Sequence, residues 1–416
     1  MSFGRLPRGL SAFGHRNFRL FWFGQLISLA GTWMQGVAQA WLVLQLTNDP
    51  LALGIVAAGQ FGPVLVLGLF AGLVADSVNK RAALIWTQLL ASVLALVLGM
   101  LVWSGGVQVW HVFVLALLLG VVNAFDMPVR QAFVVEMVGR PDIANAVALN
   151  SAVFNGTRII GPAIAGLMIA TVGMVPLFLL NSASYLAVVA SLVMMRPAEL
   201  FPPSQRAVLA RSVRSVVDQL VEGLRYIRSN TEIMVSIVVL GLVSTFALNF
   251  QVLIPVLSRE VLKGDAETFG FMMAASGAGS LLAALAIAFG LRPTMRLMIA
   301  GTIAIGLGMA GLGLVRILPL SLGLMFVAGW GLIAMAATIN TNIQLSTPDQ
   351  LRGRVMSVYT TVFAGSVPIG GLFSGALAAA WGVQAALAVG GIVALLAALM
   401  AAVWTYRPMR TAVASG

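Results

Sequence analysis

The chain has 416 residues, of which 60% are hydrophobic and only 9% are charged, and its formal net charge at pH 7 is +11. Soluble globular domains carry about 25% charged residues, so this composition excludes an ordinary soluble enzyme or binding module. The absence of cysteine excludes disulfides, thiol nucleophiles and thiolate metal sites.

Long apolar stretches recur along the whole chain, and each can cross a hydrocarbon core of about 30 Å. They lie at residues 18–46, 51–75, 82–103, 111–138, 143–172, 175–195, 233–257, 268–290, 296–315, 319–345, 354–381 and 383–406. The basic N-terminal tail runs into the first stretch without a small-residue cleavage site, so we expect no cleaved leader peptide. The predicted fold class is an all-α polytopic membrane protein with 12 transmembrane helices.

Basic residues gather on one side of the predicted helices. The two tails, the loop after the second stretch and the segment 196–228 hold most of the 24 lysines and arginines, whereas the opposite loops hold only Arg259, Lys263 and Arg316. By the positive-inside rule, both termini should lie in the cytoplasm and the protein in the cytoplasmic (inner) membrane. Because the charge is dispersed over short loops, we expect no nucleic-acid partner.

The middle of the chain interrupts the apolar pattern. Prolines at 197, 202 and 203 end the sixth predicted helix, and residues 213–229 place apolar side chains at helical spacing. This spacing predicts an amphipathic helix along the bilayer surface or the underside of the protein. The chain therefore divides into an N-terminal six-helix bundle at 1–195, a cytoplasmic linker at 196–232 and a C-terminal six-helix bundle at 233–416.

The two bundles resemble each other in sequence. Pro141-Asp142 recurs 207 residues later, and Pro162 recurs as Pro368, 206 residues later. These offsets are close to half the chain length and indicate a six-plus-six duplication with pseudo-twofold symmetry. Transporters built in this way place the substrate site at the repeat interface, near the bilayer midplane.

Arg158 and Asp126 are charged residues that lie deep inside predicted spans. Arg158 lies in the fifth, and the repeat extends the fourth helix beyond Asp126, with Pro128 as an internal kink. At 1.5 Å per residue, the depths of the two charges differ by about one helical turn. Asp126 can pair with Arg158 on the next helix or with Arg130, four residues away on its own helix, and the sequence leaves both pairings open. Arg158 could instead cap carbonyls freed by Pro162.

Asp126 is the only acidic residue placed deep within a predicted span, since Glu136 lies at the cytoplasmic end of the fourth. It is therefore the candidate for proton coupling, with Arg158 and Arg130 as the switch residues beside it. A carboxylate that alternates between a paired and a desolvated environment could couple its protonation to the opening of the molecule.

Two motifs resemble those of the major facilitator superfamily. The loop GLVADSVNKR matches the superfamily's signature at Gly72, Asp76, Lys80 and Arg81, although serine and asparagine replace the usual basic residue and glycine. A carboxylate at this position can cap a neighbouring helix and latch one conformation, the alternative being an ordinary charged turn. The antiporter motif of the fifth helix is matched in part by Gly161, Pro162 and Gly166.

Longer segments resemble one branch of that superfamily, the transmembrane secretion effectors, which include the enterobactin exporter and macrolide-efflux-type carriers. They are HRNFRLFWFGQLISLAGTWMQ, from His15, and NAFDMPVRQAF, from Asn123. The superfamily's fourth-helix arginine motif is missing, since that region reads LLLGVVNAFD, so its proton-linked role is not carried over.

In the fold that this resemblance implies, the first, fourth, seventh and tenth helices line a central cavity. On these helices we expect substrate contacts from Trp33, Gln35, Gln39, Asn123, Phe246, Asn249, Phe250, Trp330, Asn340 and Asn342. Amides mixed with aromatic rings suit a bulky amphipathic ligand better than a compact ion. The alternative is that many of these amides join helices to one another.

The resemblance implies a secondary transporter that exports small amphipathic molecules, drug-like or siderophore-like, by alternating access with proton antiport. The alternatives are an importer or lysolipid flippase of the same fold, or a non-transporting membrane scaffold or sensor. There is no P-loop, and His15 and His111 cannot build a metal site, so we expect neither an enzyme nor a bound cofactor or metal. The expected partners are a small-molecule substrate, protons and membrane lipid, and the expected state is a monomer.

Overall fold

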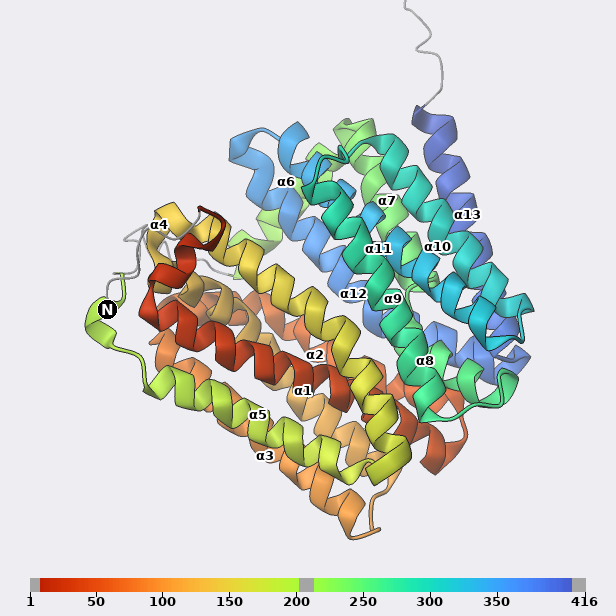
Figure 1. Ribbon diagram of the computed structural model, residues 1–416. Coiled ribbons are helices and arrows are strands. Elements are labelled where there is room, and N and C mark those ends of the chain that lie inside the picture. The colour runs from red at the N-terminus through yellow and green to blue at the C-terminus, as the bar shows by residue number, and fades with distance from the viewer. Residues whose placement is uncertain (1–7, 202–212, 406–416) are drawn as a thin grey trace, which may run out of the picture.

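The computed structural model describes residues 8–201 and 213–405, which are helical almost throughout and contain no β-strand (Figure 1). The first half consists of η1 (Arg8–Gly14), α1 (Arg16–Thr47), α2 (Pro50–Ser77), α3 (Lys80–Trp103), α4 (Val109–Val172) and α5 (Val175–Val193). The remainder consists of η2 (Pro197–Glu199), α6 (Val213–Ser229), α7 (Thr231–Phe246), α8 (Phe250–Val256), η3 (Leu257–Val261), α9 (Ala266–Ala288), α10 (Met295–Leu314), α11 (Leu318–Ser346), α12 (Asp349–Trp381) and α13 (Val383–Thr405).

The helices account for the predicted spans. Within the described residues, 10 helical segments are long and apolar enough to cross a membrane. The 64-residue α4 contains two predicted spans, which meet at Gly139, where φ is 68°. Counting α4 twice and adding the 32-residue α1 gives the predicted twelve.

The fourth span continues past Asp126, as the repeat predicted. Pro128 lies inside α4, yet the only non-helical dihedral angles in this helix are those of Gly139. Proline removes one backbone hydrogen bond from a helix, but here it does not end the helix. Asp126 is therefore held on a continuous helix within the bundle.

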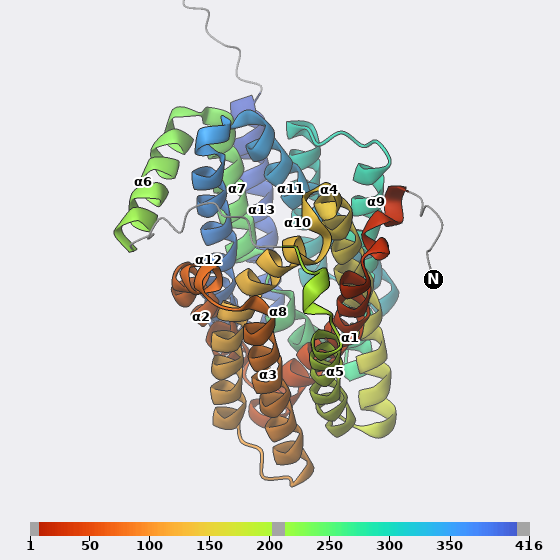
Figure 2. The same ribbon diagram turned by 90° about the vertical axis from the view of Figure 1, so that its left-hand side faces the viewer.

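The helices group into two halves. Helices α1 to α5 pack against one another, and so do α7 to α13; Figure 1 shows the first group in red to yellow-green and the second in green to blue. The amphipathic α6 packs on α12 and lies beside it in Figure 2. Gly223 approaches the backbone of Arg354 so closely that a Cβ would lie 2.6 Å from its carbonyl oxygen, and Glu222 forms an ion pair with the same arginine. The limits 1–195, 196–232 and 233–416 stay predictions.

Two seams join the halves, α2 with α12 and α4 with α9. A Cβ on Gly54 would lie 2.4 Å from the carbonyl oxygen of Gly371, and one on Gly270 would lie 2.5 Å from that of Pro162. Arg259 Nη1 donates to the carbonyl of Leu44 at 3.0 Å, the one direct hydrogen bond between α1–α5 and α7–α13 found within the described ranges. These contacts lie toward the end of the bundle opposite the start of α1, so the halves are closed at that end.

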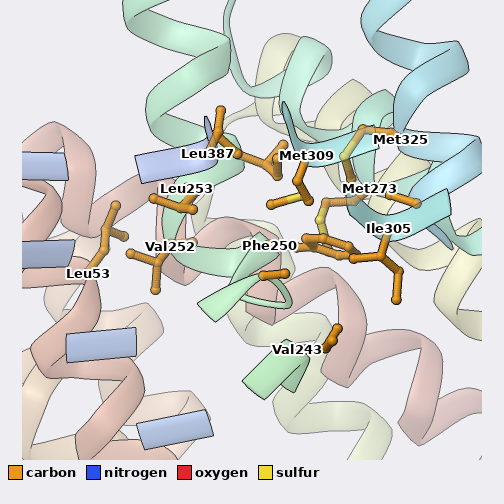
Figure 3. Close-up of a cluster of buried hydrophobic side chains, with 14 of the residues drawn as sticks. Leu53, Val243, Phe250, Val252, Leu253, Met273, Ile305, Met309, Met325 and Leu387 are labelled. Carbon is orange, nitrogen blue, oxygen red and sulfur yellow. The ribbon is translucent and has the colours of Figure 1, made fainter. Parts of the chain in front are cut away.

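A dense apolar core fills the C-terminal half. Phe250 packs among Met273, Ile305, Met309 and Met325, as Figure 3 shows. Phe250 is only 5% exposed. Its ring is therefore part of the core in this conformation, and not part of an open cavity surface.

Candidate functional site: buried charges and the seam between the halves

Asp126 is the centre of a buried polar cluster between α3 and α4. Its carboxylate accepts hydrogen bonds from Thr87 Oγ1 at 2.6 Å, from Gln88 Nε2 at 2.8 Å and from Arg130 Nε at 2.8 Å. A second guanidinium nitrogen of Arg130 completes an ion pair. The side chain of Asp126 is 5% exposed, so these donors replace the water that the carboxylate has lost.

The structure settles the two pairings that the sequence left open, in favour of Arg130. The pairing of Asp126 with Arg158 is not formed, because the carboxylate points toward α3 inside the N-terminal half. The i,i+4 geometry with Arg130 survives because Pro128 does not break the helix. Thr87 and Gln88 were not predicted, although two adjacent polar residues inside an apolar span were a signal for them.

Arg158 has no partner in the part of the chain that the structure describes: neither a hydrogen bond nor an ion pair joins its side chain to those residues. Its side chain is partly exposed, and its carbonyl oxygen lies 3.0 Å from the position that a Cβ on Gly277 of α9 would take. The suggested cap on carbonyls freed by Pro162 is therefore not formed. Arg158 is left as a cation beside the seam between the halves.

The partial antiporter motif explains how α4 touches two helices at once. A Cβ on Gly161 would lie 2.7 Å from Cβ of Trp33 on α1, and one on Gly166 would lie 2.9 Å from the carbonyl of Ala266. Any side chain at these two positions would push the helices apart. The motif thus packs α4 against α1 in its own half and against α9 in the other half.

The loop signature lies at the end of the bundle where α1 begins. Lys80 Nζ and Glu136 Oε1 are 2.8 Å apart, which ties the start of α3 to α4. Arg81 donates to the carbonyls of Leu192 and Val193 at 2.7 and 3.0 Å, where a cation is favoured by the C-terminus of α5. Both contacts stay within the N-terminal half.

The other two predicted latch residues contribute no described side-chain contact. Gly72 has open space where a Cβ would point. The predicted role of Asp76 depends on a side chain that lies outside the described parts of the structure.

A second acidic residue at this end holds η1. Asp142 accepts from Ser11 Oγ at 2.6 Å and contacts His15 Nε2 at 2.9 Å, while Asn145 accepts from the backbone of Ala12. The hydrogen bonds from Ser11 and then His15 hold the pKa of Asp142 below its usual 3.8. The Asp142 carboxylate therefore stays ionised at neutral pH and fixes η1 to the start of the fifth span.

Apart from Phe250, which lies in the apolar core, the predicted cavity residues divide into two groups. Three of them are buried amides with hydrogen-bond partners in the protein. Gln35 accepts from Asn181 at 2.7 Å and Gln39 donates to Gln60 at 3.1 Å, so both join α1 to a neighbouring helix. Asn249 donates to the carbonyl of Thr245, four residues earlier in the chain. The other group is partly exposed and comprises Trp33, Asn123, Phe246, Trp330, Asn340 and Asn342. Substrate contact by this group stays a prediction.

An apolar groove lies on the N-terminal half. It has a volume of about 640 Å³ and lies between α1, α4 and α5. Its walls include Ile27, Met34, Val153 and Ile160. In the described residues, no group of three or more histidines and acids could hold a metal ion.

Comparisons with known proteins agree with this architecture. A family model described as transmembrane secretion effector matches residues 8–415, which confirms the predicted resemblance. The chain is 31% identical over 377 residues to the multidrug efflux pump Tap of Mycolicibacterium fortuitum, covering 88% of this chain and 90% of that protein. It is 24% identical to the staphyloferrin A transporter of Staphylococcus aureus, covering 90% and 92% of the two chains.

A solved structure has the same fold. The crystal structure of the nucleoside transporter NupG superposes with a TM-score of 0.75 over 94% of this chain and 100% of that one, at 10% sequence identity. The protein is therefore a multi-pass membrane transporter for small molecules and not an enzyme. The chain belongs to the transmembrane secretion effector family of the major facilitator superfamily.

Proposed function

We propose that this transporter exports small amphipathic molecules from the cytoplasm by alternating access, in exchange for protons. The observation that carries the proposal is the closed seam at the end opposite the start of α1, where Arg259 bridges to Leu44. With the termini in the cytoplasm of a bacterial cell and the chain in its inner membrane, as the basic residues favour, such a molecule is closed to the outside. A transporter in this state can bind a ligand from the cytoplasm.

The ligand class is supported by the surfaces available to it. Partly exposed aromatic rings and amides lie on α1, α4, α7 and α11, and the groove on the N-terminal half is almost wholly apolar. The relatives' names, a multidrug efflux pump and a staphyloferrin A transporter, are in keeping with export of bulky molecules. Membrane lipid surrounds the monomer that we propose as the working unit.

Proton coupling is proposed at Asp126. In the closed state, Arg130 and two neutral donors compensate its buried charge. If the outward-open state withdraws Arg130, the carboxylate is left desolvated, and uptake of a proton becomes the means of neutralising it. Arg158 does not contact Asp126 in this conformation, and the switch proposed here does not use it.

A gating role is proposed for the contacts of the loop signature. Lys80–Glu136 and the Arg81 contacts with α5 hold α3, α4 and α5 as one body at the cytoplasmic end. Such a body can move against the C-terminal half without changing internally, and Asp76 is proposed to complete the latch between them.

The test is transport of N-phenyl-1-naphthylamine in inverted vesicles with an imposed pH gradient. Wild-type protein should accumulate the dye when the vesicle lumen is acidic, and Asp126→Asn should lose the response to the gradient. Accumulation only with the gradient reversed would indicate an importer, and no accumulation would indicate a scaffold or sensor. Movement of a lysolipid in place of the dye would indicate a flippase. Proton coupling at Asp126 is refuted if Asp126→Asn responds to the gradient as wild type does.

A further inference from the structure

We infer that Arg158 binds a single negatively charged group on the transported molecule, such as a carboxylate or a sulfonate. This inference rests on the proposed function and narrows its substrate class to amphipathic acids. It explains a cation that neither the proton switch nor the loop contacts use.

The first observation is that Arg158 has no counter-ion among the residues that the structure describes. The acidic residue within a span, Asp126, is already paired with Arg130. At the cytoplasmic end, Glu136 is paired with Lys80 and Asp142 with His15. Arg158 lies 16 residues from Asp142, about 24 Å along the helix, so those acids are out of its reach.

The second observation is the direction in which the side chain leaves α4. At 100° per residue, Arg158 lies on the arc between Gly161, about 60° away, and Pro162, about 40° away. Gly161 faces α1 of the same half, whereas the backbone of Pro162 faces α9 of the other half. The guanidinium therefore leaves the helix between α1 and α9, at the junction of the two halves.

The third observation is the surface next to it. Phe154 lies one turn away on the same face of α4, and its ring meets Trp33 edge-on with 5.6 Å between the ring centroids. A ligand with an aromatic or aliphatic body could lie on this pair while its acid group reaches Arg158. One cation beside apolar rings suits a singly charged acid better than a polyphosphate.

The free-energy cost of an unpaired arginine inside a membrane span argues against Arg158 having no function. A guanidinium at the centre of a membrane span is costly to insert when nothing compensates its charge. Here no acid of the described residues pairs with Arg158, and its side chain is partly exposed. The acid group of a bound ligand would supply the missing negative charge. The ion pair with Arg158 would break when the halves separate.

A matched pair of probes tests this directly. The dye 8-anilinonaphthalene-1-sulfonate is N-phenyl-1-naphthylamine with an added sulfonate, so the pair isolates one negative charge. Binding of both is measured with the purified full-length protein, for wild type, Arg158→Gln, Arg158→Lys and the exposed-loop control Arg316→Gln. Because a charge-assisted hydrogen bond contributes on the order of a tenfold change in affinity or more, Arg158→Gln should bind the sulfonate about tenfold more weakly.

The expected pattern is specific to charge. Arg158→Gln should leave binding of the neutral dye unchanged, Arg158→Lys should retain much of the sulfonate affinity, and Arg316→Gln should match wild type. Equal loss for both dyes, or no loss for either, overturns the inference. Competition by a single-chain phosphatidylglycerol would identify the bound anion as a lipid headgroup, and failure to compete would identify it as a soluble acid.

The binding and transport measurements together distinguish failure of the anion site from failure of the export proposal. If wild-type protein binds the sulfonate through Arg158 but moves neither dye in vesicles, the export proposal fails and the anion site stands. If both dyes are exported equally by wild type and Arg158→Gln, and bind equally, the anion site fails and export stands.

Discussion

Asp126 and Arg130 form a buried ion pair whose two members are not equally exposed. The side chain of Asp126 is 5% exposed and that of Arg130 is 25% exposed. Removing one partner of a buried pair costs about 3–5 kcal/mol, because the other charge is left uncompensated. Arg130→Gln should therefore lower the thermal unfolding midpoint of the purified protein more than Asp126→Asn, whose remaining arginine can reach solvent.

The double variant Asp126→Asn/Arg130→Gln gives the decisive comparison. It leaves no uncompensated charge, so its unfolding midpoint should lie above that of Arg130→Gln. Arg316→Gln, an exposed arginine far from the pair, should leave the midpoint unchanged. Strictly additive losses in the double variant would mean that the two side chains do not stabilise each other.

For single residues, the sequence predicts the position of Asp126 along its helix but not its ion-pair partner. Hydropathy and the repeat were enough to place the carboxylate inside the fourth helix. The choice between Arg130 and Arg158 depends on the rotation of that helix about its axis, which the sequence did not determine. The same holds for Gln35 and Gln39, which were expected to contact substrate and instead join helices.

At the scale of elements, η1 is held by a contact that depends on pH. Ser11 and His15 lower the pKa of Asp142, so the ionised carboxylate is favoured in the folded state. The resulting stabilisation is complete above the usual pKa of 3.8 and is lost as the pH falls through the lowered value. The part of η1 docking that depends on the Asp142 carboxylate should therefore weaken in strong acid.

Asp142→Asn should reproduce the acid state at neutral pH. We expect faster amide hydrogen exchange across Leu10–Phe13 in this variant, measured by mass spectrometry against wild type. Asp349 stands at the repeat-related position, is exposed, and pairs only with the nearby Arg352. Asp349→Asn should leave exchange in η1 unchanged, and equal effects of the two variants would contradict a specific role for Asp142.

The seam between α2 and α12 depends on a close approach of two backbones. A Cβ on Gly54 would lie 2.4 Å from the carbonyl oxygen of Gly371, which is not a flexible atom, so Gly54→Ala must push the helices apart. Overpacking of this kind costs about 1–3 kcal/mol. Gly62 is on the same helix and has nothing within 4 Å of such a Cβ.

Thermal unfolding of the two alanine variants separates packing from helix propensity. Gly62→Ala should be neutral or slightly stabilising, since alanine is favoured over glycine in a helix by about 1 kcal/mol. Gly54→Ala should unfold at a lower temperature than wild type. Equal midpoints for the two variants would mean that the seam has room for a methyl group.

At the scale of the whole molecule, most of the architecture could be predicted because a membrane leaves few options. Each apolar stretch must be a helix, and the twelve predicted stretches coincide with the observed spans to within a few residues at most ends. Contacts across the halves could not be predicted in this way. The sequence predicts only that Arg259 is a charged loop residue. Its acceptor, the carbonyl of Leu44, is a backbone atom 215 residues away in the chain and leaves no sequence pattern.

Arg259 should bias the equilibrium between the closed and open states of this end. Its hydrogen bond to Leu44 exists only while the halves are in contact, and a hydrogen bond from a charged donor contributes about 1.5–3 kcal/mol. Arg259→Gln should therefore reduce the ratio of closed to open molecules by roughly 10- to 100-fold. The chain has no cysteine, so spin labels can be attached at Gln45→Cys and Glu260→Cys without competing sites.

Double electron–electron resonance between these labels reports the opening. Wild-type protein should give mainly the short distance of the closed end, and Arg259→Gln should move population to a longer distance. Arg316 lies in a loop of the same side but is exposed, and it forms no hydrogen bond or ion pair with α1–α5 in the described structure, so Arg316→Gln should retain the short distance. If Arg259→Gln also keeps the short distance, the glycine seams alone close this end, and the bridge to Leu44 is a consequence of closure that does not stabilise it.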